Sequence, residues 1–118
     1  MDEFDLIRRY FAPLATSPGA DGLRDDVAEI ARFENGTGLI ATKDAIVEGV
    51  HFLPDDPPDT VARKALRVNL SDLAAKGAVS AGFVLTLALR KADEVWLKPF
   101  AAALGEDAAQ FKCPLLGG

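Results

Sequence analysis

The sequence predicts an α+β domain that combines a mixed or antiparallel sheet with two long helices. Two long segments, residues 60–76 and 93–111, repeat apolar residues at helical spacing. Several shorter apolar runs are separated by Gly, Pro and Asn, a pattern typical of about four or five strands. With 118 residues the chain has the length of one compact domain. We therefore expect one domain over residues 1–118.

The N-terminal segment predicts a helix followed by a loop. Apolar residues recur at helical spacing over residues 3–14, and Pro13 is expected to help end that helix. Residues 16–22, which read TSPGADG, are rich in residues that interrupt regular structure and are expected to form a loop.

The following segment predicts a β-hairpin. Asn35-Gly36 lies between the apolar runs 27–33 and 39–42, and this dipeptide between two such runs is a strong local signal for a hairpin turn. A further extended stretch is expected over residues 45–52.

The C-terminal half predicts two helices with a strand between them. Asp59 is expected to cap a helix over residues 60–76 that ends at Gly77. A buried strand is expected over residues 84–89, before the second helix at 93–111. The side chains of that helix expected to face inward are Trp96, Leu97, Phe100, Leu104 and Ala108.

Composition excludes several classes of function. The net charge is −5 and no basic stripe is present, so nucleic acid is not an expected partner. The longest apolar run, residues 81–89, is too short to span a bilayer, and the acidic N-terminus does not resemble a secretory signal. We expect a cytoplasmic protein without a membrane partner. The single cysteine, Cys113, permits no internal disulfide and is expected to be a core thiol.

Acidic residues occupy positions at which carboxylates could hold a cation. Asp25 and Asp26 lie between the loop and the first strand, Asp44 follows the hairpin, and Asp72 interrupts the apolar helical segment 68–75. Burial of an unpaired carboxylate costs several kcal/mol. Asp72 is therefore expected at the helix edge, paired with a base, or bound to a cation such as Mg²⁺.

Simpler interpretations of these residues remain open on pattern alone. Asp25, Asp26 and Asp44 could be turn residues, and Asp72 could lie on a solvated face beside Lys64 or Arg67. His51 is the only histidine, and with no second histidine and no cysteine cluster the sequence does not predict a zinc site. Neither a Walker loop nor a GxGxxG motif is present, so an ATP site would need another architecture.

Several segments resemble the thiamine-monophosphate kinases. Residues 42–52, TKDAIVEGVHF, are similar to the TDxxVEGVHF segment of that family, and residues 64–78, KALRVNLSDLAAKGA, are similar to its KALAVNLSDLAAMGA helix. Residues 4–11, FDLIRRYF, resemble its N-terminal FxLIxRYF helix, and residues 115–118, LLGG, resemble the start of its LxGGDT turn. The resemblance covers nearly the whole chain.

The resemblance implies ATP-dependent phosphorylation of thiamine monophosphate to thiamine diphosphate, by direct in-line transfer within a homodimer. Residues 1–118 correspond to the N-terminal ATP- and Mg²⁺-binding and dimerisation domain of the aminoimidazole ribonucleotide synthetase-like superfamily. The C-terminal domain of that family is absent from this chain, so the chain alone is expected to be inactive.

The resemblance also implies site roles by matching position, none of them an acid or base catalyst. The implied magnesium ligands are Asp26, Thr42, Asp44 and Asp72. The implied ligand contacts are His51 with thiamine monophosphate, and Gly118 and Phe111 with ATP.

One position departs from the family pattern. Arg24 replaces a glycine of the usual GIGDD turn, so that turn either has a different backbone conformation or offers a positive charge to a phosphate. Two other functions remain open: another superfamily member with a different acceptor, such as a selenophosphate synthetase or a hydrogenase-maturation protein, and a non-catalytic dimerisation or nucleotide-binding module.

Overall fold

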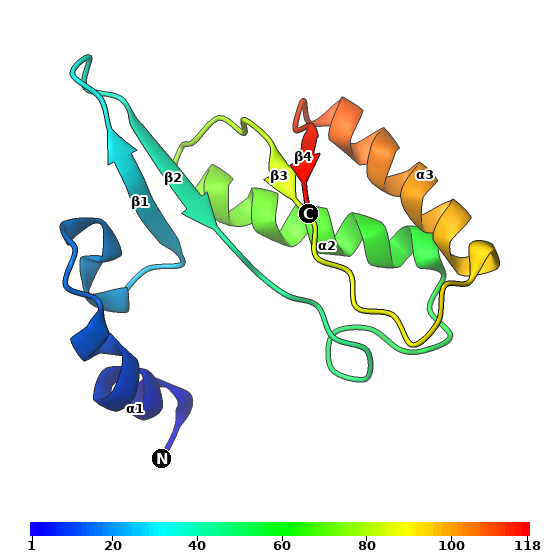
Figure 1. The fold of residues 1–118 in the computed structure, drawn as a ribbon, viewed down its shortest axis with the longest axis horizontal. Helices are drawn as coiled ribbons and strands as arrows, with labels where there is room; N and C mark the ends of the chain where they lie inside the picture. The colour runs from blue at the N-terminus through cyan, green and yellow to red at the C-terminus, as the bar shows by residue number, and fades with distance from the viewer. The chain divides into compact units, whose positions relative to one another are not determined.

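The computed structural model describes all residues from 1 to 118. The chain forms two compact units, Met1–Lys43 and Asp44–Gly118, which are described in turn (Figure 1). Both helices and strands are present, so the predicted α+β class is confirmed. No helix has the length and apolar character needed to cross a membrane.

The first unit begins with three short helical turns in place of one regular helix. α1 (Glu3–Leu6) continues into a π-helical turn, Ile7–Phe11, and then a 3₁₀ turn, Ala12–Leu14. The predicted helical extent is therefore confirmed, but most of it is not α-helical. Pro13 lies in this last turn, and because it lacks the N–H that a helical hydrogen bond needs, the helical segment ends one residue later, at Leu14.

The expected loop at residues 16–22 is partly ordered. Pro18–Leu23 forms 3₁₀ turns that pack against the first strand. The contact is close at Gly19, where an added Cβ would lie 2.2 Å from the carbonyl oxygen of Glu29. Only glycine allows the two backbones to approach this closely.

The predicted hairpin is confirmed. β1 (Val27–Arg32) pairs antiparallel with β2 (Gly38–Thr42), and a bulge lies between Glu29 and Ala31. In the turn, Asn35 Oδ1 accepts hydrogen bonds from the amide and the hydroxyl of Thr37, at 3.0 Å and 2.6 Å. The local turn chemistry thus fixes the register.

The second unit begins with a compact loop, so the extended stretch expected over residues 45–52 is wrong. Only an isolated bridge between Glu48 and Phe52 forms there. The backbone turns back on itself at Gly49, whose φ is +81°, and the Gly49 amide donates to the carbonyl of Phe52 at 2.7 Å. These local bonds satisfy the backbone groups that a strand would have presented to a partner.

The first long helix is α2 (Pro58–Ala75). The expected cap at Asp59 is wrong, because the helix already begins at Pro58 and Asp59 lies in its first turn. Proline suits this position because the first helical N–H has no intrahelical partner. Gly77, with φ of +69°, follows the C-terminus as predicted.

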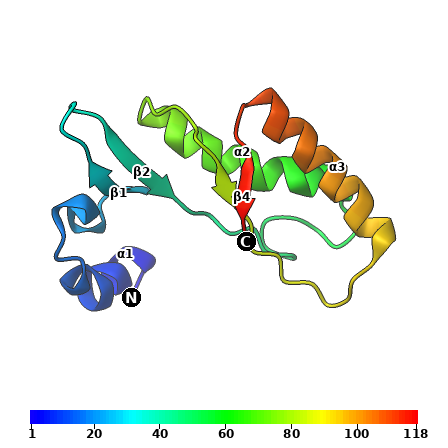
Figure 2. The same ribbon diagram turned by 45° about the horizontal axis from the view of Figure 1, so that its top comes forward.

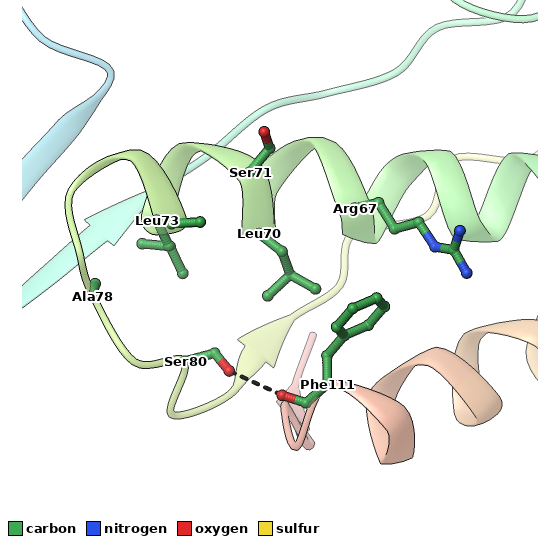
Figure 3. A pocket seen from close by; sticks show the side chains of 8 residues that line it. Arg67, Leu70, Ser71, Leu73, Ala78, Ser80 and Phe111 are labelled. Carbon is green, nitrogen blue, oxygen red and sulfur yellow. Dashed lines mark hydrogen bonds between the residues drawn. The ribbon is translucent and has the colours of Figure 1, made fainter.

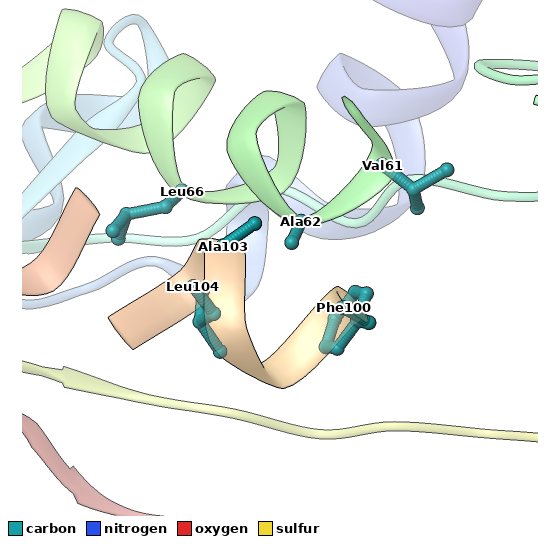
Figure 4. Packing of buried hydrophobic residues seen from close by; sticks show 6 residues of the cluster. All are labelled: Val61, Ala62, Leu66, Phe100, Ala103 and Leu104. Atoms are coloured by element: carbon teal, nitrogen blue, oxygen red, sulfur yellow. The ribbon is translucent and has the colours of Figure 1, made fainter. Parts of the chain in front are cut away.

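The second long helix, α3 (Glu94–Gln110), packs against α2 (Figures 1 and 2). The Asp93 side chain caps α3 by accepting from the Val95 amide at 3.0 Å. The buried core between the helices consists of Val61, Ala62, Leu66, Phe100, Ala103 and Leu104 (Figure 4).

The predicted inward face of α3 is confirmed. Phe100 and Leu104 are buried, and Trp96 stacks on Phe100 with ring centroids 4.7 Å apart. Leu97 and Ala108 are half-buried.

A short parallel pair completes the second unit. β3 (Phe83–Val84) pairs with β4 (Leu115–Gly117), next to α2 in both views (Figures 1 and 2). The buried strand expected over residues 84–89 is wrong, since only Val84 of that stretch lies in a strand and this residue is 74% exposed. The Leu85 amide adds one hydrogen bond to this pair, to the Gly117 carbonyl at 2.9 Å. Cys113 is buried as expected.

Candidate functional site

In the first unit, the hairpin places two of the expected ligands side by side. Asp26 immediately precedes β1, and Thr42 ends β2 opposite Val27. The Thr42 hydroxyl donates to the Asp26 carbonyl at 2.7 Å. A hydroxyl that donates one hydrogen bond keeps its lone pairs. Thr42 Oγ1 and the exposed Asp26 carboxylate can therefore both offer oxygens to a cation.

The turn ahead of Asp26 does not require glycine at position 24. Asp21, Gly22 and Leu23 take the left-handed conformation, with φ of 45°, 63° and 59°. Arg24 itself has an ordinary φ of −87°. Its guanidinium bonds Asp21 instead of remaining unpaired, with Nη2 2.5 Å from Asp21 Oδ1. The departure from the family turn is thus accommodated by the backbone before Arg24.

In the second unit, Asn69 links Asp44 to helix α2. Asn69 Nδ2 donates to the Ala65 carbonyl at 2.8 Å and to the Asp44 carbonyl at 3.4 Å. Asn69 Oδ1 is buried and has no hydrogen-bond partner. Asp72 is half-buried and lies three residues further along, on the same side of the helix.

These donor atoms fit a hard divalent cation. Asp44 and Asp72 supply carboxylate oxygens, and Asn69 Oδ1 is an orphaned buried oxygen in the same part of the unit. Oxygen ligands of this kind are those that Mg²⁺ prefers. No three His, Cys, Asp or Glu side chains form a ready metal cluster. Asp26 and Thr42 belong to the first unit, Asp44 and Asp72 to the second.

The two bases considered as neighbours of Asp72 are bound elsewhere. Lys64 Nζ donates to the carbonyl of His51. Arg67 pairs with Asp107. The Asp72 carboxylate therefore forms an ion pair with neither base.

His51 belongs to the compact loop that precedes α2. Its side chain is exposed, and Nδ1 accepts a hydrogen bond from the Val47 amide at 2.9 Å. In the same loop, the Glu48 carboxylate pairs with Arg90 at 3.2 Å.

Phe111 follows α3 and borders an open groove (Figure 3). The guanidinium of Arg67 lies 5.6 Å from the centre of the Phe111 ring. Ser80 Oγ donates to the Phe111 carbonyl at 3.2 Å. The remaining lining residues of the groove are Leu70, Ser71, Leu73, Ala74 and Ala78.

Gly118 lies against the backbone that follows β3. A Cβ at this position would be 2.0 Å from the Leu85 carbonyl oxygen, so no residue with a side chain fits without a backbone shift. This close approach is a steric reason for glycine at position 118, and this reason does not depend on any contact with a ligand.

An ion-pair network between α2 and α3 was not predicted from the sequence. The fully buried Asp107 accepts from Arg63 Nη1 at 2.6 Å and from Arg67 Nε and Nη2 at 2.8 Å and 2.9 Å. Arg63 also pairs with Glu106 at 2.6 Å. The hydrogen bond from Arg67 and that from Arg63 hold the pKa of the Asp107 carboxyl below its ordinary value, although burial opposes this shift. The i, i+4 spacing of the two arginines was the available signal.

Comparison with known proteins gives a consistent family. Residues 24–118 match the family described as AIR synthase related protein, N-terminal domain. The chain is 47% identical to the thiamine-monophosphate kinase of Caulobacter vibrioides, over 98% of this chain and 33% of that protein. It is 44% identical to the thiamine-monophosphate kinase of Escherichia coli K12, over 98% of this chain and 36% of that protein.

Two solved structures are similar. The thiamine monophosphate kinase (ThiL) of Aquifex aeolicus matches with a TM-score of 0.65 and 32% identity, over 69% of this chain and 28% of that chain. AaThiL complexed with AMPPCP and TMP matches with a TM-score of 0.69 and 26% identity, over 98% of this chain and 35% of that chain. The chain spans about a third of the length of the curated relatives it matches.

Proposed function

We propose, since the chain belongs to the family of AIR synthase related proteins, that it supplies the ATP- and Mg²⁺-binding part of a thiamine-monophosphate kinase. The reaction transfers a phosphoryl group from ATP to thiamine monophosphate and yields thiamine diphosphate. One observation carries this proposal: the identity of 47% to a protein of that name extends over 98% of this chain. A further similar structure is complexed with TMP and with AMPPCP, an analogue of ATP.

The proposed metal ligands are Asp26, Thr42, Asp44 and Asp72. Both substrates are anions, so their approach requires charge neutralisation more than a strong base. Bound Mg²⁺ would supply that neutralisation. The residues themselves offer oxygen atoms only, and the orphaned Oδ1 of Asn69 supports a polar occupant near Asp44.

The proposed transfer is direct, from ATP to the phosphate of thiamine monophosphate. The one cysteine, Cys113, is buried and has no role in this proposal. In-line transfer needs positioning of donor and acceptor above all. In this proposal His51 contacts thiamine monophosphate, whereas Phe111 and Gly118 contact ATP.

We propose further that residues 1–118 form the N-terminal domain of a homodimer that acts in the cytoplasm, where ATP is supplied. The exposed apolar side chains of the hairpin, Ile30 and Leu39, are suited to burial against a second copy.

The proposal is tested by an activity assay of the full-length protein. The assay measures the Mg²⁺-dependent phosphorylation of thiamine monophosphate by ATP. Asp44→Asn should lower the activity roughly 100-fold or more, since even residues behind metal ligands cost about 10- to 100-fold when changed. The matched control is Asp55→Asn, an exposed carboxylate in the same unit, which should leave the activity unchanged. This chain alone should show no turnover.

Other outcomes would contradict the proposal. Use of ATP with a different acceptor only would favour another member of the superfamily. Nucleotide binding without turnover by the complete protein would favour a non-catalytic module. Full activity of Asp44→Asn would remove Asp44 from the metal site.

A further inference from the structure

The groove beside Phe111 combines an aromatic ring, a cation and apolar surface (Figure 3). All of its lining residues belong to the second unit. Leu70, Leu73 and Ala74 of α2 supply apolar surface, and Phe111 is 37% exposed at its edge. Nucleotide bases stack on aromatic side chains in a way that tolerates any base, because every base has a π-face. The groove therefore has side chains suited to a nucleotide base.

Arg67 is the only charged residue that lines this groove, and its guanidinium is anchored. Nε and Nη2 donate to the two carboxylate oxygens of Asp107, at 2.8 Å and 2.9 Å. Two parallel bonds of this kind fix the plane of a guanidinium as well as its position. Asp107 is fully buried on α3, so the packing between the helices also holds the carboxylate. The guanidinium of Arg67 therefore has a defined orientation.

The same guanidinium lies over the Phe111 ring. Its central carbon is 5.6 Å from the centre of the ring, within the range of a cation–π contact. The backbone of Phe111 is held separately: its carbonyl accepts from Ser80 Oγ at 3.2 Å, and its amide donates to the Asp107 carbonyl at 2.9 Å. These bonds leave the side-chain torsions of Phe111 unrestrained, so the contact with Arg67 is the one suited to orient the ring.

We propose that Arg67, anchored by Asp107, is a positioning residue that orients the Phe111 ring as a stacking surface for the base of the nucleotide. This inference rests on the proposed function, in which Phe111 contacts ATP. A ring that is already oriented loses less conformational freedom when the base binds, so the nucleotide is bound more tightly. Alanine occupies the corresponding position of the family segment KALAVNLSDLAAMGA, so that helix does not require an arginine at position 67 in order to fold.

Arg67→Met tests this role in the full-length protein, with Arg63→Met as the matched control. Both arginines lie on α2 and donate to the Asp107 carboxylate, but Arg63 neither lines the groove nor contacts the Phe111 ring. The dissociation constant of AMPPCP, an analogue of ATP, should be measured by calorimetry with Mg²⁺ present. From the usual strength of a cation–π contact we expect a rise of about 3- to 10-fold for Arg67→Met, and no change for Arg63→Met. Equal rises in the two variants would overturn the inference, because both remove one partner of Asp107.

A second pair of variants shows whether Arg67 acts through the ring. Phe111→Leu removes the stacking surface and should raise the dissociation constant of AMPPCP roughly 10-fold. In the Phe111→Leu background, Arg67→Met should raise it by less than about 2-fold more, because the two residues act as one unit. An undiminished effect of Arg67→Met in that background would overturn the positioning role, since Arg67 would then contact the nucleotide itself.

Kinetic constants separate this inference from the proposed function. In Arg67→Met the KM for ATP should rise, whereas kcat and the KM for thiamine monophosphate should change by less than about 2-fold. A full-length protein that binds AMPPCP but does not phosphorylate thiamine monophosphate would refute the proposed function, and the AMPPCP measurements would still decide the role of Arg67. A full-length protein that does not bind AMPPCP would refute both.

Discussion

Replacing Asp107 with alanine should strongly destabilise the second unit. Asp107 is fully buried and accepts three hydrogen bonds from two arginines of α2, at 2.6 to 2.9 Å. The substitution removes the only carboxylate shared by both guanidiniums. Of the polar links between α2 and α3, only the Arg63–Glu106 pair would remain.

The magnitude follows from the exposure of the partners. Breaking a buried ion pair by removal of one partner costs about 3–5 kcal/mol. The side chains of Arg63 and Arg67 are 30% and 49% exposed, so water can partly replace the lost carboxylate. We therefore expect a loss of about 2–3 kcal/mol for Asp107→Ala. For a chain of this size that loss lowers Tm by roughly 8–12 °C.

Urea and thermal denaturation should be followed by the fluorescence of Trp96, which is the only tryptophan and stacks on the core residue Phe100. The matched control is Glu106→Ala, one residue earlier on α3. Its carboxylate is 69% exposed and contacts only Arg63, so its loss should cost less than about 1 kcal/mol. Equal losses in the two variants would refute the assignment of stability to the buried carboxylate.

The same carboxylate predicts a dependence of stability on pH. The pKa of Asp107 is lower in the folded state than its ordinary value, because Arg67 and then Arg63 bond the charged form. Its contribution is therefore present above the unfolded pKa of about 3.9 and is lost as pH falls from there through the folded pKa. In the Asp107→Asn variant, the urea midpoint of unfolding should depend less on pH in that range. A variant whose midpoint falls with pH as steeply as that of the unchanged protein would contradict the pKa shift.

Three further predictions concern single sites. Gly105→Ala should stabilise the protein by about 0.5–1 kcal/mol in urea denaturation, because the position is helical and a Cβ there meets nothing within 4 Å. A destabilised variant would show that the added methyl group does not fit. Gly19→Ala should speed amide hydrogen exchange in the hairpin, since its Cβ would lie 2.2 Å from the Glu29 carbonyl oxygen; unchanged exchange would show that the 3₁₀ turns do not support β1. Labelling of the Cys113 thiol should be slow and should follow unfolding of the second unit in urea, because the thiol is buried; fast labelling in native buffer would refute that burial.

Elements specified by local chemistry were predictable from the sequence. Asn35-Gly36 determines the hairpin turn, and the register that follows brings Thr42 next to Asp26. The periodicity of α2 likewise places Asn69 and Asp72 on one side of that helix. These parts of the candidate site depend on contacts between near neighbours in sequence or across one turn.

Elements that depend on distant partners were not predictable. Residues 45–52 and 84–89 have apolar and β-branched patterns typical of strands. The first segment instead satisfies its own backbone groups, and in the second only Val84 lies in a strand. The pairing of Arg67 with Asp107 spans 40 residues and depends on how α2 packs on α3. The sequence alone therefore left Arg67 open as a neighbour of Asp72.

The Asp107 ion pairs also have a geometric consequence for α2. Each residue of an α-helix turns the side-chain direction by about 100°. Two arginines one turn apart that bond a single buried carboxylate therefore fix the rotation of α2 about its own axis. That rotation sets the directions in which Lys64, Asn69 and Asp72 leave the helix. The directions of these three side chains are thus set by the ion pairs that join α2 to α3.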